Sequence, residues 1–200
     1  MPSPRNRPEP AARSRIAVPD DPRDLPGDFA FCRDVEVRFA DTDAMGHVNN
    51  ARYLTYFEIA RAAYYEAVTG RPLPLGVHGA TEGMILADVR VTYRSPTFYG
   101  ETVSVETRVS HVGRSSFTME HRLTAPDSPY GQLRLVATAE SVLVSYDYAA
   151  ERPIVVPADL ADQVEAFEGR VLGPMASRSS SAETSGGWVA GASPPPPVSE

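Results

Sequence analysis

The sequence contains no lysine, since all 19 of its Lys+Arg residues are arginine. This absence excludes a lysine nucleophile and a lysine Schiff base from any chemistry that the chain performs. Cysteine is nearly absent as well: the single Cys32 excludes an intramolecular disulfide and suits a reducing compartment. Because Cys32 lies in a strand-like segment, we expect it to be a small core residue and not a nucleophile.

Long apolar runs and an excess of positive charge are missing too. No run approaches the ~20 residues needed to span a bilayer, and the N-terminus has arginine but no apolar secretory core. We therefore expect a cytoplasmic protein that does not associate with membranes. The formal net charge of -7 argues against a nucleic-acid partner, because the surface of a nucleic-acid binder is usually basic.

Motifs for metals and common cofactors are also absent. His78, His111 and His121 are scattered without the spacing of a zinc or iron site. The chain has no glycine-rich phosphate loop, no dinucleotide fingerprint and no serine nucleophile elbow. We therefore expect neither a metal nor another cofactor.

The sequence does contain a regular alternation of apolar and polar residues. It predicts strands over residues 31–39, 84–93, 101–110, 115–123 and 132–146, with a turn at 127–131. Apolar residues at three- and four-residue spacing predict one helix from about Asn50 to Val68, ended by Gly70 and Pro72. Alternation means that one sheet face is buried, and the single long helix is its natural cover. The fold class is therefore α+β, a curved antiparallel sheet wrapped around one long helix.

Composition places this domain at residues 29–172, with a short helix near its end. Residues 1–28 are rich in Pro, Arg, Ala and Asp without a sustained period, which predicts a disordered arm. Residues 173–200 are rich in Ser, Gly and Pro and predict a disordered tail, which includes Trp188.

The most informative segment joins the first strand to the helix. Residues 41–50 read Asp-Thr-Asp-Ala-Met-Gly-His-Val-Asn-Asn. Asp43 stands in a turn, Gly46 lets the chain bend, and a helix N-terminus follows. A carboxylate placed there can attack, or direct water at, a carbonyl that the helix polarises. Aspartate in a turn also serves local hydrogen bonding, and tying down the loop is the role that we expect for Asp41.

Five segments of the chain resemble a known family. They are residues 41–50, 53–61, 93–96 together with Gly100-Glu101, 112–117 and 152–160. Across about residues 30–165, the chain resembles the hotdog-fold thioesterases of the 4-hydroxybenzoyl-CoA thioesterase type, which include many small bacterial acyl-CoA thioesterases. The resemblance implies the hotdog fold and the hydrolysis of an acyl thioester.

The resemblance also assigns catalytic roles. Asp43 matches the family's catalytic carboxylate, which acts as nucleophile or as general base. The backbone amide of Asn50, or of a neighbour, matches the donor to the carbonyl oxygen. Gly46 would permit the bend and the close approach of substrate, and His47 would brace the turn or assist proton transfer.

Substrate-binding candidates follow from the same resemblance. They are Tyr53, Arg94, Arg114, Ser115 and Ser116. Arginine can hold the phosphates of coenzyme A bidentately. Arg114 is therefore the first candidate, helped by the two serines, and Arg94 is the second, with a structural role at its strand end as the alternative.

The sequence thus predicts an acyl-CoA thioesterase that forms a homodimer or homotetramer with sites between subunits. Two alternatives stay open: a non-catalytic acyl-thioester binding protein, and a thioesterase whose donor is acyl carrier protein. Glu58 on the helix is the alternative catalytic carboxylate, because some hotdog thioesterases place theirs there. An ion pair of Glu58 with Arg61 is the simpler account of that residue.

Overall fold

The computed structural model describes residues 28–73, 81–126 and 132–173. Its elements in chain order are β1 (Phe31–Glu36), the 3-10 helix η1 (Phe39–Asp41), α1 (Arg52–Thr69), β2 (Glu82–Tyr93), β3 (Thr102–Val112), β4 (Ser116–Ala125), β5 (Arg134–Asp147), β6 (Arg152–Pro153) and α2 (Ala158–Glu168). The predicted arm and tail lie almost entirely outside the described residues, as do Trp188 and the turn predicted at 127–131.

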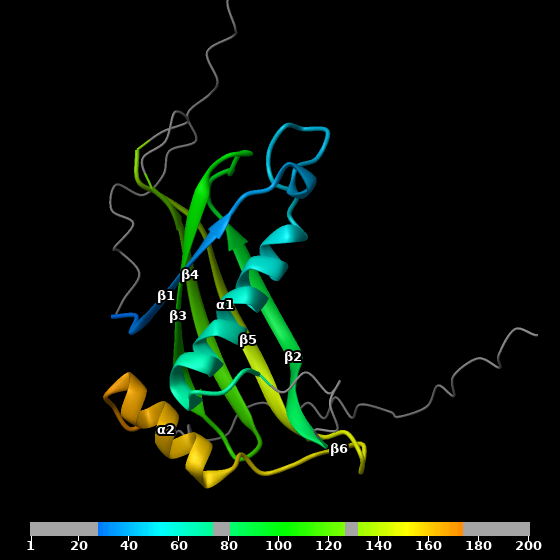
Figure 1. Cartoon of the computed structure of the whole chain (residues 1–200), viewed down its shortest axis with the longest axis vertical. Helices are drawn as coiled ribbons and strands as arrows, with labels where there is room; N and C mark the ends of the chain where they lie inside the picture. Colours follow the sequence, from blue (N-terminus) through cyan, green and yellow to red (C-terminus); the bar gives the residue numbers. More distant parts are fainter. Residues whose placement is uncertain (1–27, 74–80, 127–131, 174–200) are drawn as a thin grey trace, which may run out of the picture.

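The strands form one antiparallel sheet in the order β1-β3-β4-β5-β2, and β6 pairs with β5. Figure 1 shows α1 lying lengthwise against one face of this sheet, with α2 beside the end at which α1 stops. The α+β class predicted from the sequence is confirmed.

α1 packs on the sheet through an aromatic stripe. Its most deeply buried apolar residues, each at most 3% exposed, are Tyr53, Tyr56, Phe57, Ala60 and Tyr64. The helix begins at Arg52 and not at Asn50. It ends where Gly70 takes a left-handed conformation with φ of 67°, which glycine adopts at little cost.

A band of polar side chains crosses the middle of the core. Thr107 of β3 and Ser141 of β5 hydrogen-bond to the two ring nitrogens of His121 on β4, at 3.0 and 3.1 Å. Burial, together with the charge of the nearby Arg61 guanidinium, lowers the pKa of His121 from 6.5 to about 3. The imidazole is therefore neutral at physiological pH. The band lies between two apolar clusters, one beneath each half of α1.

Two predictions about the first strand are wrong. Cys32 is exposed, because it lies in register with Glu106 on the polar face of the sheet. The strand also ends at Glu36, after which the chain turns into η1. In a strand that continued to residue 39, the alternation would put Phe39 on the buried face with Val35 and Val37; in the structure Phe39 is 75% exposed.

The alternation also fails at the start of β5. In the strand predicted over residues 132–146, the alternation would place Leu133 toward the core and Arg134 toward solvent; in the structure Leu133 is 53% exposed and Arg134 is 8% exposed. The pairing of β4 with β5 shifts register between Leu123 and Thr124. Such a bulge places the side chains beyond it on the opposite face of the sheet. A bulge cannot be recognised from the period-two alternation of the sequence.

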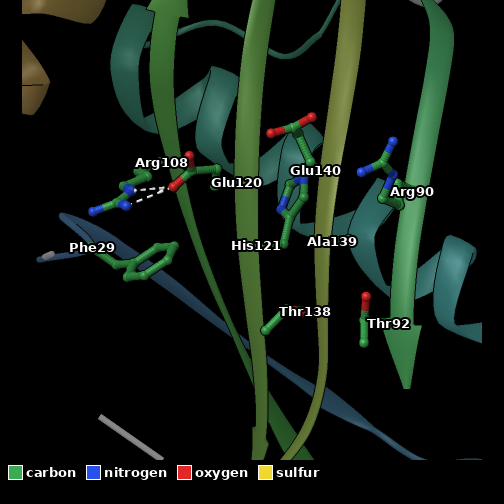
Figure 2. Close-up of a pocket in the computed structure, with 9 residues that line it drawn as sticks. All are labelled: Phe29, Arg90, Thr92, Arg108, Glu120, His121, Thr138, Ala139 and Glu140. Atoms are coloured by element: carbon green, nitrogen blue, oxygen red, sulfur yellow. Dashed lines mark hydrogen bonds and ion pairs between the residues drawn. The ribbon is translucent and has the colours of Figure 1, made fainter. Parts of the chain in front are cut away.

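The sheet face turned away from α1 carries cross-strand ion pairs. Arg108 pairs with Glu120 at 2.6 Å, and Arg122 pairs with Glu106. The Phe29 ring lies 4.6 and 4.8 Å from the two guanidinium carbons. Figure 2 shows the hollow of about 310 Å³ on this face, whose lining also includes Arg90, Thr92, Thr138 and Glu140. The ion pairs make this face polar, as expected of the solvent side of an antiparallel sheet.

The two edges of the sheet differ. Beyond β1, the edge of β3 is covered by C-terminal residues. Glu168 accepts the Val109 N–H at 2.8 Å, Arg170 donates to the Val109 carbonyl at 3.0 Å, and Leu172 accepts the Val112 N–H at 2.8 Å. At the opposite edge, β2 pairs with β5 alone in the described part of the chain. An uncovered edge strand is a template for pairing with another chain.

Candidate active site

Residues 42–48 form a tight hairpin after η1. Thr42 and Val48 pair through a β-bridge. The Asp43 N–H donates to the His47 carbonyl at 3.0 Å, and the Gly46 N–H donates to the Asp43 carbonyl at 3.0 Å. Gly46 has φ of +79°, while the space where a Cβ would lie is open. The requirement for glycine is therefore conformational, and the bend expected at this residue is present.

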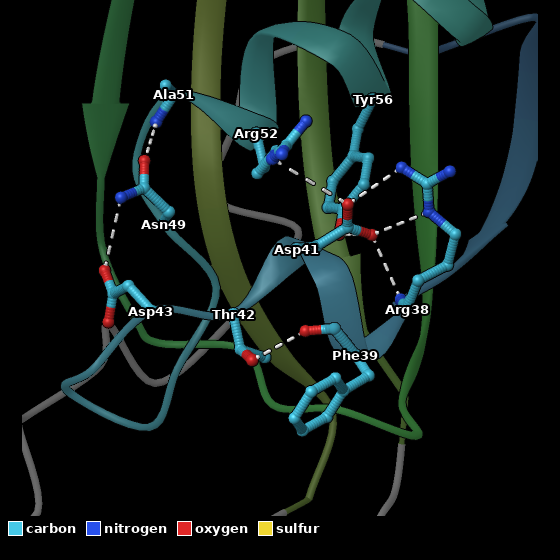
Figure 3. A network of polar contacts seen from close by, with 9 residues as sticks. All are labelled: Arg38, Phe39, Asp41, Thr42, Asp43, Asn49, Ala51, Arg52 and Tyr56. Atoms are coloured by element: carbon cyan, nitrogen blue, oxygen red, sulfur yellow. Dashed lines mark hydrogen bonds and ion pairs between the residues drawn. The ribbon is translucent and has the colours of Figure 1, made fainter.

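The turn holds one oxygen of the Asp43 carboxylate and leaves the other weakly bound. Oδ1 accepts the Met45 N–H at 2.8 Å, an arrangement common for aspartate in turns. Oδ2 has a long hydrogen bond of 3.4 Å from the Asn49 side-chain amide. The residue is partly exposed, so Oδ2 is accessible to a reacting group (Figure 3).

Asn49 connects this carboxylate to the N-terminus of α1. Its Oδ1 accepts the Ala51 N–H at 2.9 Å, and its carbonyl accepts the Arg52 N–H at 2.9 Å. The intervening Asn50 N–H has no acceptor among the described residues, and the Asn50 carbonyl accepts the Tyr93 hydroxyl at 2.9 Å. An unsatisfied donor therefore lies at the positive end of a helix dipole, next to the residue that contacts the carboxylate.

Asp41, the second carboxylate of the turn, is fully buried. It accepts hydrogen bonds from the backbone and guanidinium of Arg38 and from the Tyr56 hydroxyl, and Arg52 lies 4.0 Å away. The Arg38 hydrogen bonds hold the pKa of Asp41 below its usual value, although burial opposes them. Its carbonyl also accepts the Asn49 N–H at 2.9 Å. Asp41 thus ties the turn to α1 (Figure 3), which agrees with its expected structural role.

A buried ion pair supports the hairpin. Arg134 and Glu101 are 8% and 3% exposed and lie 2.6 Å apart. The Glu101 carbonyl accepts the Val37 N–H, and the Thr97 carbonyl accepts the Val48 N–H, both at 2.8 Å. The ion pair therefore holds in place the loop to which the hairpin is hydrogen-bonded. This pairing could not be predicted from the sequence, because it depends on the bulge that turns Arg134 inward.

The structure separates most of the predicted coenzyme A contacts from Asp43. Arg94 is exposed and follows β2 at the same end of the sheet as the hairpin. Arg114, Ser115 and Ser116 lie in and beside the β3–β4 turn, at the opposite end according to the strand register. With a rise of ~3.3 Å per residue, the two ends lie on the order of 25 Å apart. One chain alone does not bring these residues together.

The remaining candidates have varied surroundings. Tyr53 is 2% exposed and its hydroxyl lies 2.6 Å from Thr97 Oγ1, so it packs in the core of the isolated chain. His47 is half-buried and its Nδ1 lies 3.2 Å from the next carbonyl. Glu58 is exposed on α1. The expected ion pair of Glu58 with Arg61 is not formed among the described residues, because Arg61 turns inward and is 9% exposed.

This arrangement suits acyl transfer. A carboxylate with one accessible oxygen lies beside a helix N-terminus that can stabilise negative charge on a carbonyl oxygen. In the described residues, no three His, Cys, Asp or Glu side chains are grouped so that they could hold a metal ion. None of the helices described is long and apolar enough to cross a membrane.

Comparison with known proteins identifies the family. Residues 37–164 match the thioesterase-like superfamily. The chain belongs to this superfamily. The predicted hotdog thioesterase fold and thioester hydrolase activity are thereby confirmed.

Individual thioesterases show how far the similarity extends. The putative acyl-CoA thioesterase YneP of Bacillus subtilis is 27% identical over 68% of this chain and 94% of its own length. A Thermus thermophilus thioesterase solved with coenzyme A and Zn is 34% identical, with a TM-score of 0.59 over 71% of this chain and 96% of that one. The 4-hydroxybenzoyl-CoA thioesterase of Pseudomonas sp. strain CBS-3, at 23% identity, shares the fold with a TM-score of 0.60 over 66% of this chain and 97% of its own.

Proposed function

We propose that this thioesterase hydrolyses acyl-CoA to a free acid and coenzyme A, with Asp43 as its catalytic carboxylate. One observation carries the assignment: the accessible Asp43 Oδ2 lies near a helix N-terminus at which the Asn50 N–H has no acceptor in the described residues. The similarity to YneP supports coenzyme A as the donor. The single cysteine is consistent with action in the cytoplasm.

The geometry serves either of two routes. In the first, Asp43 attacks the thioester carbonyl, the thiolate of coenzyme A leaves, and water hydrolyses the resulting mixed anhydride. In the second, Asp43 takes a proton from a water molecule that attacks the carbonyl directly. Both routes place negative charge on the carbonyl oxygen, which the Asn50 N–H and the α1 dipole would stabilise.

The complete site is proposed to form between two chains. The free edge of β2 lies beside exposed apolar residues: Leu86 on β2 and Leu54 and Ile59 on α1 are 38 to 39% exposed. Pairing of two β2 strands about a twofold axis would be antiparallel and would cover these residues. It would also bring the Glu82 end of one β2 next to the Tyr93 end of the other.

This dimer would bring together predicted site residues that lie far apart within one chain. Arg114 lies at the Glu82 end of its own sheet, and Asp43 lies at the Tyr93 end. In the antiparallel dimer, Arg114 of one protomer would therefore approach the side of the partner that carries Asp43. Arg114 is exposed and could bind the phosphates of a coenzyme A whose thioester reaches the other chain.

Thiol release from a panel of short, long and aromatic acyl-CoAs tests the proposed reaction. We expect the preferred substrate to reach kcat/KM of about 10⁴ M⁻¹s⁻¹ or more, the range of ordinary enzymes. The same acyl groups on acyl carrier protein distinguish the two donors. Tight binding of acyl-CoA without thiol release from any member of the panel would instead favour the non-catalytic binding protein.

Mixing two defective variants tests whether the site is shared between chains. Asp43→Asn should be inactive, and Arg114→Ala should have a raised KM for acyl-CoA with little change for an acyl-pantetheine, which lacks the nucleotide phosphates. In a mixed dimer, one of the two sites then contains both wild-type residues. We expect co-refolded chains to regain about a quarter of wild-type activity, because half of the dimers are mixed. If the two residues served one site within a chain, mixing would restore nothing.

A further inference from the structure

Arg61 is a buried cation without a hydrogen-bond or ion-pair partner in the described part of the chain. It lies on the inner side of α1 with 9% of its surface exposed. Across residues 28–73, 81–126 and 132–173, no acceptor receives its N–H groups and no carboxylate lies within ion-pair distance. A guanidinium stays charged even when buried, and an unpaired buried charge is strongly unfavourable. An acceptor from outside the described residues, such as the oxygen of an anion, would therefore stabilise the Arg61 guanidinium.

No described residue forms an ion pair with Arg61. His121 is held neutral by burial. Glu58, one turn earlier on α1, is exposed and forms no ion pair with Arg61; burial lowers the pKa of Arg61, and the more distant Glu58 charge only partly opposes this. Glu82 is exposed and borders only the outer cleft described below. The sequence of residues 74–80 contains no Asp or Glu.

Arg61 borders a narrow cavity of about 30 Å³ between α1, the sheet and α2. All the other described residues that line it are apolar or aromatic, among them Tyr65, Leu73, Met84, Leu143 and Leu160. One water molecule needs roughly 10–15 Å³ by the same measure, so the cavity holds about two or three non-hydrogen atoms. A carboxylate group has that size.

A wider cleft of about 390 Å³ adjoins the cavity. The two hollows have Tyr65, Leu73, Met84 and Leu160 in common as lining residues. Ser145 also borders the cleft; it is 2% exposed, and its buried hydroxyl has no hydrogen-bond partner among the residues that the structure describes. Two buried polar side chains without a partner among the described residues thus border this space of two adjoining hollows. The described wall of the cavity is otherwise apolar, whereas Thr81 and Glu82 also line the cleft.

We propose that this space binds the carboxylate end of a slender apolar ligand, with the Arg61 guanidinium paired to the carboxylate. Such a pair gives charge-assisted hydrogen bonds in an apolar environment. The ligand has two possible sources. It is either a free alkyl carboxylate or the far end of an acyl thioester that carries a second carboxylate, and the latter source rests on the proposed thioesterase function.

Direct binding tests the site without reference to catalysis. Octanoate and octanol are titrated calorimetrically into wild type, Arg61→Gln and the control Arg90→Gln, whose side chain is exposed and lines the hollow on the polar face of the sheet. We expect octanoate to bind wild type and the control at least about tenfold more tightly than Arg61→Gln, the effect of losing a hydrogen bond to a charged group. Octanol should bind weakly and equally to all three. Equal binding of octanoate to all three proteins would overturn the proposal.

Thermal unfolding without ligand checks the state of Arg61. Removal of an unpaired buried charge should leave the melting temperature of Arg61→Gln equal to or above that of wild type. Octanoate should raise the melting temperature of wild type and not that of the variant. A large loss of stability in ligand-free Arg61→Gln would show that the guanidinium has a partner within the protein, and would also overturn the proposal.

Hydrolysis distinguishes the two sources of the ligand. Octanoyl-CoA is compared with the C8 thioester that bears a terminal carboxylate, in wild type and Arg61→Gln. A preference for the carboxylate-bearing substrate that falls at least about tenfold in the variant identifies the acyl end as the ligand. An unchanged preference together with lost octanoate binding identifies the free acid. If neither substrate is hydrolysed, the proposed function fails, and octanoate binding still decides the carboxylate site.

Discussion

Asp43→Asn should lower kcat for acyl-CoA hydrolysis by about 10²- to 10⁴-fold, the usual contribution of a positioned catalytic base. The reason is chemical and not structural. An asparagine can still accept the Met45 N–H through its side-chain oxygen, so the hairpin keeps its shape. What disappears is the negative charge of the accessible oxygen. Steady-state thiol release and thermal unfolding, measured on the same preparation, separate the two effects.

Asp41→Asn is the matched control for this prediction. Asp41 lies two residues away, but it is fully buried among Arg38, Arg52 and the Tyr56 hydroxyl. Its replacement should lower the melting temperature clearly, whereas Asp43→Asn should change stability by no more than about 0.5 kcal/mol, as for an ordinary surface substitution. A stable Asp43→Asn variant with full activity would show that the assignment is wrong, and Glu58 would be the next carboxylate to replace.

The two substitutions also show why the turn contains two carboxylates. Asp41 has all of its acceptor capacity used by groups that join η1 to α1, so it is fixed and cannot reach a substrate. Asp43 uses one oxygen for the turn and retains the other. Local structure and reactivity are thus divided between two residues, and Asn49 couples them through contacts with both.

Features of the fold that depend on local periodicity were predictable from the sequence. The stripe from Tyr53 to Tyr64 specifies a helix with one buried side, and the alternation in β3 and β4 specifies which residues face it. The turn around Gly46 was predictable for a similar reason, since a left-handed residue before a helix is signalled by glycine.

Features that depend on the register or path of the chain were not predictable. The bulge in the pairing of β4 with β5 turns Arg134 into the core and exposes Leu133, against the alternation. Arg61 was expected to pair with Glu58 at helical spacing, yet it turns inward toward a cavity. The distance between Asp43 and Arg114 follows from the order of the strands in the sheet. This order cannot be predicted from any single segment of the sequence.

Glu101→Gln should cost about 3–5 kcal/mol of folding free energy, the usual result of removing one partner from a buried ion pair. Arg134 would remain buried and charged, and within the described ranges its Nη1 already has no hydrogen-bond partner. Urea unfolding measures the loss. Glu120→Gln is the control: it breaks the Arg108–Glu120 pair, whose carboxylate side chain is 33% exposed, so its cost should be about 1 kcal/mol or less.

The activity of folded Glu101→Gln indicates what the buried pair does for the site. Glu101 and Thr97 belong to the loop that bonds to the backbone of Val37 and Val48, on either side of the Asp43 turn. If the pair positions that turn, kcat should fall even at low temperature, where the variant is fully folded, while KM changes little. Replacing both partners, Glu101→Leu with Arg134→Met, should recover most of the stability without restoring kcat. Full recovery of both would mean that the ion pair only supports the fold, and unchanged stability in the single variant would contradict its burial.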